Sequence, residues 1–268
     1  MTSIYRLGMA LFLLSCASTK INHQSTPINN TIYSGPDEVE TVYHLQPGSI
    51  DGCYLVKYDA SFILIDTGVY SKRTELSGAL SDIGCTPDNL KLIIITHGHY
   101  DHTGNAAYLQ KSFNAEILMH KNDVVMVESG IVPTKTRKFR PLYVRMIAPL
   151  FLLFYRSTIN DQENNFEIFQ PDIIVDDESF DLRPHGFNAI ALHIPGHSDG
   201  SIAILTEANN LFSGDILVNF NNKPTFNSNM ADISFDDLDS SIAKIKEMPI
   251  NYVFPGHGKP FSMDRLSR

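Results

Sequence analysis

Residues 96–102, with the sequence Thr-His-Gly-His-Tyr-Asp-His, constrain this chain more than any other segment. They hold three imidazoles and a carboxylate, and they directly follow the short apolar run Leu-Ile-Ile-Ile at residues 92–95. Such a run predicts a buried strand, and Gly98 and Gly104 allow the chain to turn sharply after it. Burying four such side chains in a core would cost a large desolvation energy, whereas they can converge on one or two cations. We therefore predict a metal site at the end of this strand.

Three further segments supply residues of the same chemical types at the ends of predicted strands. They are Pro-Gly-His-Ser at residues 195–198, Phe-Ser-Gly-Asp at 212–215 and Phe-Pro-Gly-His-Gly at 254–258. In each, we expect a glycine or proline to break the strand just before the coordinating side chain, so that a loop presents it at the sheet edge. A solvated histidine-rich loop without metal is the alternative, and these complementary segments argue against it.

These motifs, together with Ile-Asp-Thr-Gly at residues 65–68, resemble those of the metallo-β-lactamase-fold hydrolases, and most closely the glyoxalase II-like and lactonase-like branch. The resemblance extends from about residue 41 to residue 260. It implies an α+β fold, the four-layer αββα sandwich. In that fold two αβ halves meet face to face, and the site lies at one edge between the sheets.

The resemblance implies ligands for a first metal ion. His97, His99 and His197 would hold this ion, and Asp215 would bridge it to a second one. By the same resemblance, true β-lactamases of this fold usually lack a bridging aspartate at that position. The presence of Asp215 therefore lowers our expectation that the chain hydrolyses antibiotics.

The second ion would, again by resemblance, be held by Asp101, His102 and His257, with Asp66 as a carboxylate that steadies a ligand from outside the ligand set. We expect Asp101 to be the catalytic residue as well, because it can orient the nucleophile and later pass its proton to the leaving group. The expected cofactors are two Zn²⁺ ions, with iron or manganese as alternatives.

The ligand types also indicate a reaction. Neutral imidazoles and carboxylates suit Zn²⁺, and two ions about 3.5–4 Å apart can hold a hydroxide between them and polarise a carbonyl or phosphoryl oxygen. Because a metal-bound water can have a pKa near about 7, no serine or cysteine nucleophile is needed. We expect a hydrolase in which a metal-bridging hydroxide attacks an ester-like bond of a lactone, ester or thioester, with a lipophilic substrate slightly preferred. A phosphodiester stays open.

Composition limits the partners. The chain has 268 residues and a formal net charge of −9, and an acidic surface argues against nucleic acid as a general partner. The length is sufficient for a substantial core built from two fused αβ halves. We therefore expect a small-molecule substrate and no nucleic acid, and the sequence leaves the oligomeric state open.

The N-terminal residues have the pattern of a secretory signal. Arg6 is the only charged residue before the apolar run at residues 7–14, which is too short to span a bilayer. Residues 13–16, Leu-Leu-Ser-Cys, resemble a bacterial lipobox, which would make Cys16 the acylated first residue of the mature protein. We predict a signal peptide with a lipobox over residues 1–16. A conventionally cleaved signal and an uncleaved anchor are the alternatives.

Residues 17–40 are rich in small polar residues and predict a flexible tether, which suits a domain held off a membrane. The expected location is the bacterial cell envelope, with the protein lipid-anchored to a membrane and facing the periplasm or the cell surface. Cys53 and Cys85 would then be the only thiols of the mature protein, and whether they pair is left open.

Residues 41–268 are predicted to form the catalytic domain, because hydrophobic periodicity and turn residues alternate along them. Its second half is expected to begin near residue 172. Ser234 is expected to cap a helix with Leu238, Ile242 and Ile245 on one face. The other predicted elements are strands at 41–45, 52–57, 62–66, 91–96, 116–120, 173–175, 179–182, 188–193, 201–206, 210–212 and 251–254, and helices at 72–83, 105–113 and 122–128.

Residues 131–160 interrupt this alternation. They contain six cationic residues and no acidic one, and they include an apolar stretch at 146–155 in which Pro149 would kink a helix. We predict a helical apolar and basic insert. One interpretation is a lid over the metal cleft that meets a lipophilic substrate or anionic head groups. The other is a buried helical hairpin packed on the sandwich.

Three other functions stay open. An iron-dependent persulfide dioxygenase of this fold has a similar first histidine loop but uses one iron. A β-lactamase is the second alternative, and the third is a non-catalytic surface binding protein with a structural metal, although structural zinc sites are normally closed by four ligands. We interpret the remaining strand histidines, His120 and His193, as packed residues, with contact between His193 and the ligands as the alternative.

Overall fold

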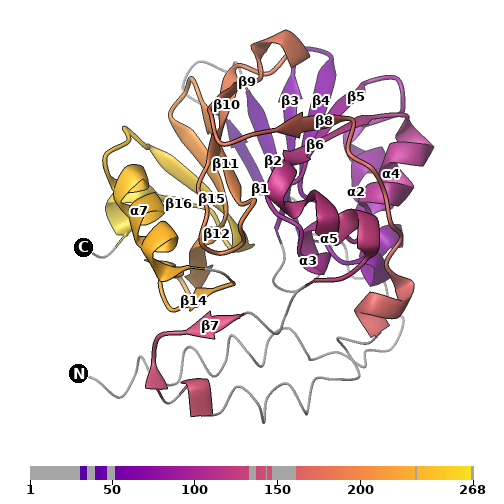
Figure 1. The fold of residues 1–268 in the computed structure, drawn as a ribbon. Helices are drawn as coiled ribbons and strands as arrows, with labels where there is room; N and C mark the ends of the chain where they lie inside the picture. The colour runs from indigo at the N-terminus through magenta and orange to yellow at the C-terminus, as the bar shows by residue number, and fades with distance from the viewer. Residues whose placement is uncertain are drawn as a thin grey trace.

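The computed structural model describes residues 31–34, 40–46, 52–132, 137–142, 144–146, 161–232 and 234–266. Two β-sheets lie face to face, and helices cover the outer face of each sheet (Figure 1). The predicted α+β fold, a four-layer αββα sandwich, is confirmed.

The first sheet belongs mainly to the first half of the chain. Its strands are β1 (Thr31–Ser34), β2 (Thr41–Leu45), β3 (Cys53–Tyr58), β4 (Ser61–Ile65), β5 (Leu90–Ile94), β6 (Glu116–His120) and β8 (Ile173–Val175). They are hydrogen-bonded in the order β1-β2-β3-β4-β5-β6-β8. The strands from β1 to β4 pair antiparallel, whereas β4, β5, β6 and β8 run parallel. The carboxyl ends of these parallel strands therefore share one edge of the sheet.

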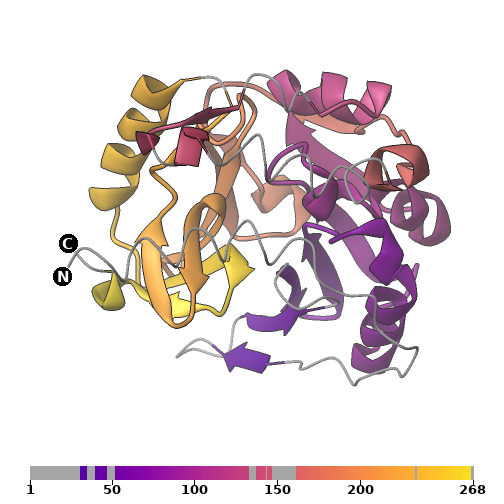
Figure 2. The same ribbon diagram turned by 90° about the horizontal axis from the view of Figure 1, so that it is seen from below.

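The second sheet comes from the second half of the chain. Its strands are β9 (Phe180–Asp181), β10 (Ala189–His193), β11 (Ile202–Thr206), β12 (Asn210–Phe220), β13 (Lys223–Phe226), β15 (Tyr252–Gly258) and β16 (Phe261–Ser262). The order is β16-β15-β12-β11-β10-β9, with β13 paired to β12. A separate two-stranded sheet joins β7 (Lys138–Phe139) to β14 (Met230–Ala231). Both of its strands lie at the lower end of the molecule in Figure 1, and Figure 2 views the two halves from that end.

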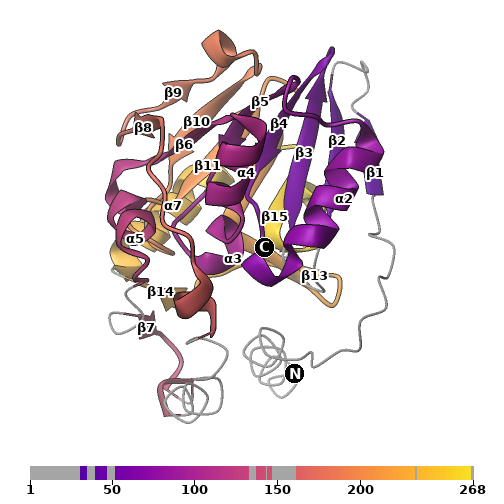
Figure 3. The same ribbon diagram turned by 90° about the vertical axis from the view of Figure 1, so that its right-hand side faces the viewer.

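Helices cover both outer faces of the sandwich. The outer face of the first sheet carries α2 (Arg73–Ile83), α4 (Ala106–Phe113) and α5 (Val124–Ser129), which face the viewer in Figure 3. The second sheet carries α7 (Phe235–Lys246). The shorter elements are α3 (Tyr100–Thr103) and the 3₁₀ turns η1 (Tyr70–Lys72), η2 (Lys121–Asp123), η4 (Arg183–His185) and η5 (Met263–Arg265).

Three hydrophobic clusters separate these layers. Leu64 and Leu80 lie in the cluster between the first sheet and its helices. Ile63 and Phe212 lie in the cluster between the two sheets. Leu238, Ile242 and Ile245 pack α7 on the second sheet, as their spacing predicts. Neighbouring residues of β4 therefore face different clusters, which is the alternation expected for a strand buried on both sides.

The N-terminus of α7 is capped as predicted. The hydroxyl of Ser234 accepts hydrogen bonds from the backbone N–H groups of Asp236 and Asp237 at 3.2 and 3.3 Å. Both aspartates lie in the first turn, where negative charge is favourable.

Two predicted boundaries are wrong, one between the two halves and one between the tether and the catalytic domain. β8, expected to open the second half, instead pairs parallel with β6 and completes the first sheet. β1 lies inside the predicted tether over residues 17–40, but its backbone pairs with β2 over four residues. Its sequence Thr-Ile-Tyr-Ser favours strand formation, and the free edge of β2 offers hydrogen-bonding groups.

Several predictions fall largely outside the described residues. The signal at residues 1–16, the tether at 17–30 and 35–39, and the insert at 133–136 and 147–160 lie there. The described part of the insert contains the strand β7, which the prediction of a helical insert missed. Residues 144–146 of the insert are helical, as predicted. Among the described helices, none has both the length and the apolar character needed to cross a membrane.

Replacing Ser234 by alanine should lower the free energy of unfolding by about 0.5–2 kcal/mol, because two N–H groups of α7 lose their acceptor. Ser234→Asp, which keeps an acceptor oxygen, is the matched control and should cost much less. Urea denaturation measures both values. Equal losses in the two variants would contradict the capping role.

Candidate metal centre

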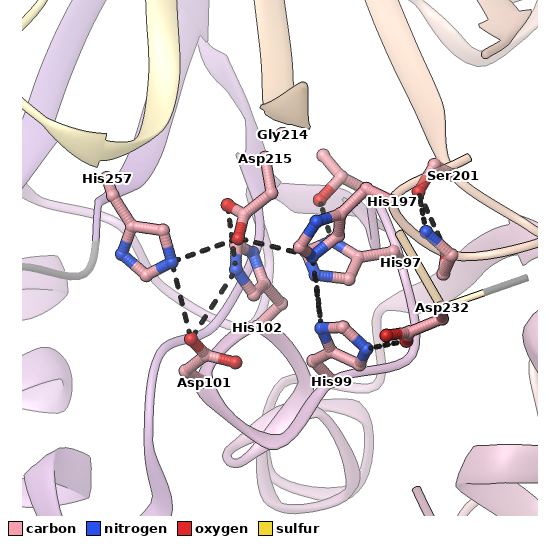
Figure 4. A network of polar contacts seen from close by, with 12 residues as sticks. His97, His99, Asp101, His102, His197, Ser201, Gly214, Asp215, Asp232 and His257 are labelled. Carbon is pink, nitrogen blue, oxygen red and sulfur yellow. Dashed lines mark hydrogen bonds and ion pairs between the residues drawn. The ribbon is translucent and has the colours of Figure 1, made fainter. Parts of the chain in front are cut away.

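All seven side chains predicted to bind metal meet at one end of the sandwich, between the two sheets (Figure 4). The loop after β5 and the short helix α3 provide four of them. The loop after β10 provides His197, and strands β12 and β15 provide Asp215 and His257. Ligand-type atoms of this set fall into groups within 4.8 Å of one another.

The first group consists of His97, His99 and His197. Nδ1 of His99 lies 3.1 Å from Nε2 of His97 and 3.2 Å from Nε2 of His197. His97 and His197 thus direct Nε2 to the common point, whereas His99 directs Nδ1. All three residues are buried.

The second group consists of Asp101, His102 and His257. The Oδ2 atom of Asp101 lies 3.4 Å from Nε2 of His257 and 3.9 Å from Nε2 of His102. The side chain of Asp101 is 28% exposed, whereas those of both histidines are buried. Asp101 is therefore the most exposed member of the set.

Asp215 lies between the two groups, as Figure 4 shows. Its Oδ1 atom is 3.3 Å from Nε2 of His102. Its Oδ2 atom is 3.4 Å from Nε2 of His197 and 3.1 Å from Nε2 of His257. One carboxylate therefore reaches histidines of both groups.

The sequence pattern predicted that loops present Asp215 and His257, but both residues lie within strands. β12 continues through Asp215 to Phe220, and β15 continues through His257 to Gly258. The parallel pairing of these two strands shifts register between Phe212 and Gly214, and again between Gly214 and Val218. Such irregularities re-aim side chains within a strand, so the glycines here bend the strands without ending them.

Asp66 contacts the second group through His102. It follows β4 with a left-handed backbone (φ 58°). Its Oδ1 accepts the backbone N–H of Thr96, and its Oδ2 accepts the Thr96 hydroxyl, both at 2.8 Å. Oδ2 also lies 2.8 Å from Nδ1 of His102. This contact orients the ring of His102 so that Nε2 points to Asp215, and it matches the steadying role expected for Asp66.

Two further carboxylates at the site were missed in the sequence. Asp232 is 1% exposed, and its Oδ2 lies 2.7 Å from Nε2 of His99. Asp123 is fully buried and accepts hydrogen bonds from the N–H groups of Gly98 at 2.8 Å and Gly200 at 2.7 Å. It therefore joins the first histidine loop to the loop that carries His197. Neither aspartate belongs to a motif with a recognisable spacing, so no local signal marked them.

Residues 196–200, Gly-His-Ser-Asp-Gly, have the spacing of a serine-nucleophile motif. Ser198, however, is fully buried. Its hydroxyl donates to Asp123 at 2.6 Å and lies 2.8 Å from the hydroxyl of Ser201. These contacts give Ser198 a role in loop packing.

Burial and neighbouring charges set the protonation preferences of the imidazoles. Burial lowers the pKa of His97 well below its ordinary value, and the neighbouring imidazoles of His102, His99 and His197 add to the effect. Burial also lowers the pKa of His197 to about 4. Both imidazoles are therefore neutral at pH 7 and offer a nitrogen lone pair, which metal binding requires.

In the second group, neighbouring carboxylates favour the protonated form of an imidazole instead of the neutral form. Burial alone would lower the pKa of His102, but Asp66, Asp215 and Asp101 together raise it well above its ordinary value. Burial would raise the pKa of Asp215, but the adjacent imidazoles of His257, His102 and His197 bring it well below its ordinary value. The centre is thus a set of ionised carboxylates among buried imidazoles.

The donor set fits divalent metal ions. Nε2 of His102 and Oδ1 of Asp215 are buried and find no hydrogen-bond partner among the described residues, and they face each other as an ion pair at 3.3 Å. Buried polar atoms without a partner are costly in a native structure. Imidazole nitrogens and carboxylate oxygens are the usual protein ligands of zinc, so a cation would satisfy these atoms.

A second histidine cluster does not have the geometry of a metal site. The rings of His120 and His193 stack with centroids 3.9 Å apart and planes at 9°, next to Asp177. Parallel rings cannot both direct a lone pair at one ion within their own planes. Nδ1 of His120 also accepts the N–H of Asn122 at 3.3 Å, and Nε2 of His193 donates to the Asp199 carbonyl at 2.8 Å. The interpretation of both as packed strand histidines is confirmed.

Comparison with known proteins gives a consistent result. The family model described as the metallo-beta-lactamase superfamily matches residues 52–257. Hydroxyacylglutathione hydrolase GloC of Haemophilus influenzae is 29% identical over 179 residues, which cover 63% of this chain and 69% of that protein. Beta-lactamase-like protein 2 homolog of Caenorhabditis elegans is 26% identical over 209 residues, covering 76% of this chain and 55% of that protein.

Solved structures share the fold at lower identity. The class B3 di-zinc metallo-beta-lactamase LRA-12 from an Alaskan soil metagenome superposes with a TM-score of 0.59 and 17% identity, covering 90% of this chain and 83% of that one. GOB-18 from Elizabethkingia meningoseptica gives a TM-score of 0.55 and 18% identity, covering 90% and 82%. At these identities the likeness concerns the fold alone.

Replacing Gly256 by alanine should destabilise the protein by about 1–3 kcal/mol, because overpacking a dense site forces its neighbours to move. A Cβ atom there would overlap Oδ1 of Asp215 and would lie 2.9 Å from Cε1 of His102. Gly78→Ala in α2 is the matched control, since its Cβ would meet no atom of the described part of the chain within 4 Å, and it should gain about 0.4–1 kcal/mol. Denaturant unfolding compares them, and an unchanged stability of Gly256→Ala would contradict the close packing.

Proposed function

The chain belongs to the metallo-beta-lactamase superfamily, and from this premise we propose that it is a hydrolase that holds two zinc ions. The position of Asp215 supports this most strongly. Its Oδ1 atom reaches His102 of the second group, and its Oδ2 atom reaches both His197 of the first group and His257 of the second, at 3.1–3.4 Å. A carboxylate in that position can join two cations, and seven ligand groups exceed the four that normally close a structural zinc site.

The proposed ligands form two sets that share one bridging carboxylate. They are His97, His99 and His197 for the first ion, Asp101, His102 and His257 for the second, and Asp215 for both. Iron and manganese are alternatives, because the same nitrogen and oxygen ligands also accept them.

When bound, a pair of zinc ions supplies an activated water molecule at neutral pH and polarises a substrate carbonyl. Asp101 is suited to handle the proton of that water, because its carboxylate borders the second group and its side chain is partly exposed. The neighbouring His102 and His257 hold its pKa below the ordinary range. It is therefore ionised at pH 7 and can accept a proton. Water adds to the acyl carbon, the bond to the leaving oxygen or sulfur breaks, and Asp101 returns the proton to that leaving group.

The proposed substrate has an ester-like bond, in a lactone, an ester or a thioester. The relative named hydroxyacylglutathione hydrolase, at 29% identity, supports an acyl group as the reacting centre. A lipophilic substrate is our preference, and it is supported by Leu142 and Met146 within the insert, which are 69% and 74% exposed. The pocket walls, rather than the metal ligands, would select among these substrates.

The alternatives make different demands on the metal. A persulfide dioxygenase would use a single iron, and a structural role would need no open coordination position. A β-lactamase stays a candidate because the solved structures with this fold include metallo-beta-lactamases.

The purified protein is expected to contain about two zinc ions per chain and to hydrolyse at least one member of a panel of lactones, thioesters and esters. Chelation should abolish the activity, and added Zn²⁺ should restore it. Metal analysis and initial rates on the panel measure both. One iron per chain with oxygen consumption, or hydrolysis of β-lactams alone, would contradict the proposal.

In the same assay Asp101→Asn should reduce kcat by roughly 10²–10⁴-fold, the usual contribution of a positioned acid or base. Asp88→Asn, in the exposed turn before β5, is the matched control and should leave kcat unchanged. An Asp101→Asn variant with unchanged turnover of every responsive substrate would remove the catalytic role of Asp101.

A further inference from the structure

The basic insert reaches the metal centre through a short antiparallel ladder. In this ladder Ala231 of β14 pairs with Lys138 of β7, and Met230 pairs with Phe139. The next residues toward the centre are Asp232 on one strand and Arg137 on the other. The ladder therefore ends with a carboxylate beside a guanidinium, directly next to His99.

Asp232 is held from three sides. Its backbone N–H donates to the carbonyls of His197 and Gly196, at 3.1 and 3.3 Å. Its Oδ2 lies 2.7 Å from Nε2 of His99, and its Oδ1 accepts the Nε–H of Arg137 at 2.7 Å. Asp232 is 1% exposed, and the Arg137 side chain is 25% exposed. The carboxylate is thus fixed to the His197 loop, to a proposed metal ligand and to the insert.

These contacts decide which nitrogen of His99 is available to a cation. Because an ionised carboxylate only accepts, the 2.7 Å contact with Asp232 keeps the proton of His99 on Nε2 and leaves the lone pair on Nδ1. Nη2 of Arg137 also lies 3.1 Å from Nε2 of His99, so Arg137 borders the ring as well as the carboxylate. Nδ1 is the atom that lies 3.1–3.2 Å from the Nε2 atoms of His97 and His197. A buried carboxylate with a single partner would be costly, and Arg137 supplies the second charged partner of Asp232.

We propose that Arg137 and Asp232 are positioning residues for His99, so that the insert takes part in building the metal centre. Asp232 sets the orientation of the His99 ring, and Arg137 holds the carboxylate of Asp232 in place. The inference rests on the proposed metal centre and extends it to two residues that would not touch the metal.

Zinc affinity measures this role directly. Metal-free protein is titrated with Zn²⁺ in competition with a chromophoric chelator, which resolves the two equivalents without any substrate. Arg137→Ala and Asp232→Ala should weaken one of the two equivalents by roughly 10–100-fold, the usual effect of removing a residue that orients a metal ligand. The other equivalent should change little, because its ligand His102 is held by Asp66.

Conservative variants separate positioning from general damage. Asp232→Asn keeps an acceptor for His99, and Arg137→Lys keeps the charge without the planar fork. Both should recover part of the lost affinity relative to the alanine variants. If an alanine variant fails to fold, these two variants carry the test, and unchanged zinc affinity in both would overturn the proposal.

Arg140 provides the matched control on the same segment. It pairs with Asp239, lies over the ring of Phe235 at 4.4 Å, and bonds the Asn229 carbonyl through its backbone N–H at 3.0 Å. Arg140→Ala therefore loosens this segment without touching His99 or Asp232, and it should leave both zinc affinities within about twofold.

The outcomes distinguish the two proposals. Equal losses of zinc affinity in Arg137→Ala and Arg140→Ala would overturn the inference. The affinity would then depend on how firmly this segment is held against the protein, and not on the contact between Arg137 and Asp232. A wild-type protein that binds no zinc would instead refute the proposed metal centre itself.

Discussion

The burial of Asp215 among three imidazoles is the interaction on which this end of the sandwich depends. Asp215 lies on the second sheet, yet its oxygens approach His102 of the first half as well as His197 and His257 of the second. A carboxylate taken out of water is costly unless charged or hydrogen-bonding partners surround it. The contacts that compensate for its burial therefore bring the two halves together and assemble the side chains that can hold cations.

A second layer of carboxylates gives this assembly its geometry. Asp66 fixes His102, Asp232 fixes His99, and Asp123 joins the loops that carry the histidines. Each acts on an imidazole or a backbone N–H, so the ligand nitrogens have defined directions. Asp232 also connects the centre to Arg137, which gives the basic insert a physical route to the chemistry.

Local patterns in the sequence predicted most of this architecture. Strand β6 and the cap of α7 were predicted as observed, since both depend on nearby residues. The histidine-rich loop after β5 was also predicted, because several ligand-type residues directly after a buried strand are costly to bury unless they meet a cation. The length of β12 was not predicted, since its continuation depends on pairing with β13 and β15.

Two carboxylates of the second layer, Asp232 and Asp123, could not be predicted, because their partners are distant in the chain. Asp232 contacts His99 across 133 positions, and Asp123 contacts Ser198 across 75. Such an aspartate looks like any other polar residue until the fold brings its partner beside it. Asp66 was assigned only because it lies in a motif, Ile-Asp-Thr-Gly, that resembles those of the family.

The most direct test is a crystal structure of the zinc-loaded protein with anomalous scattering measured at the zinc edge. Two peaks about 3.5–4 Å apart, on either side of the Asp215 carboxylate, are expected for a pair of bridged ions. A single peak, or peaks away from Asp215, would contradict the binuclear centre and the hydrolytic function built on it.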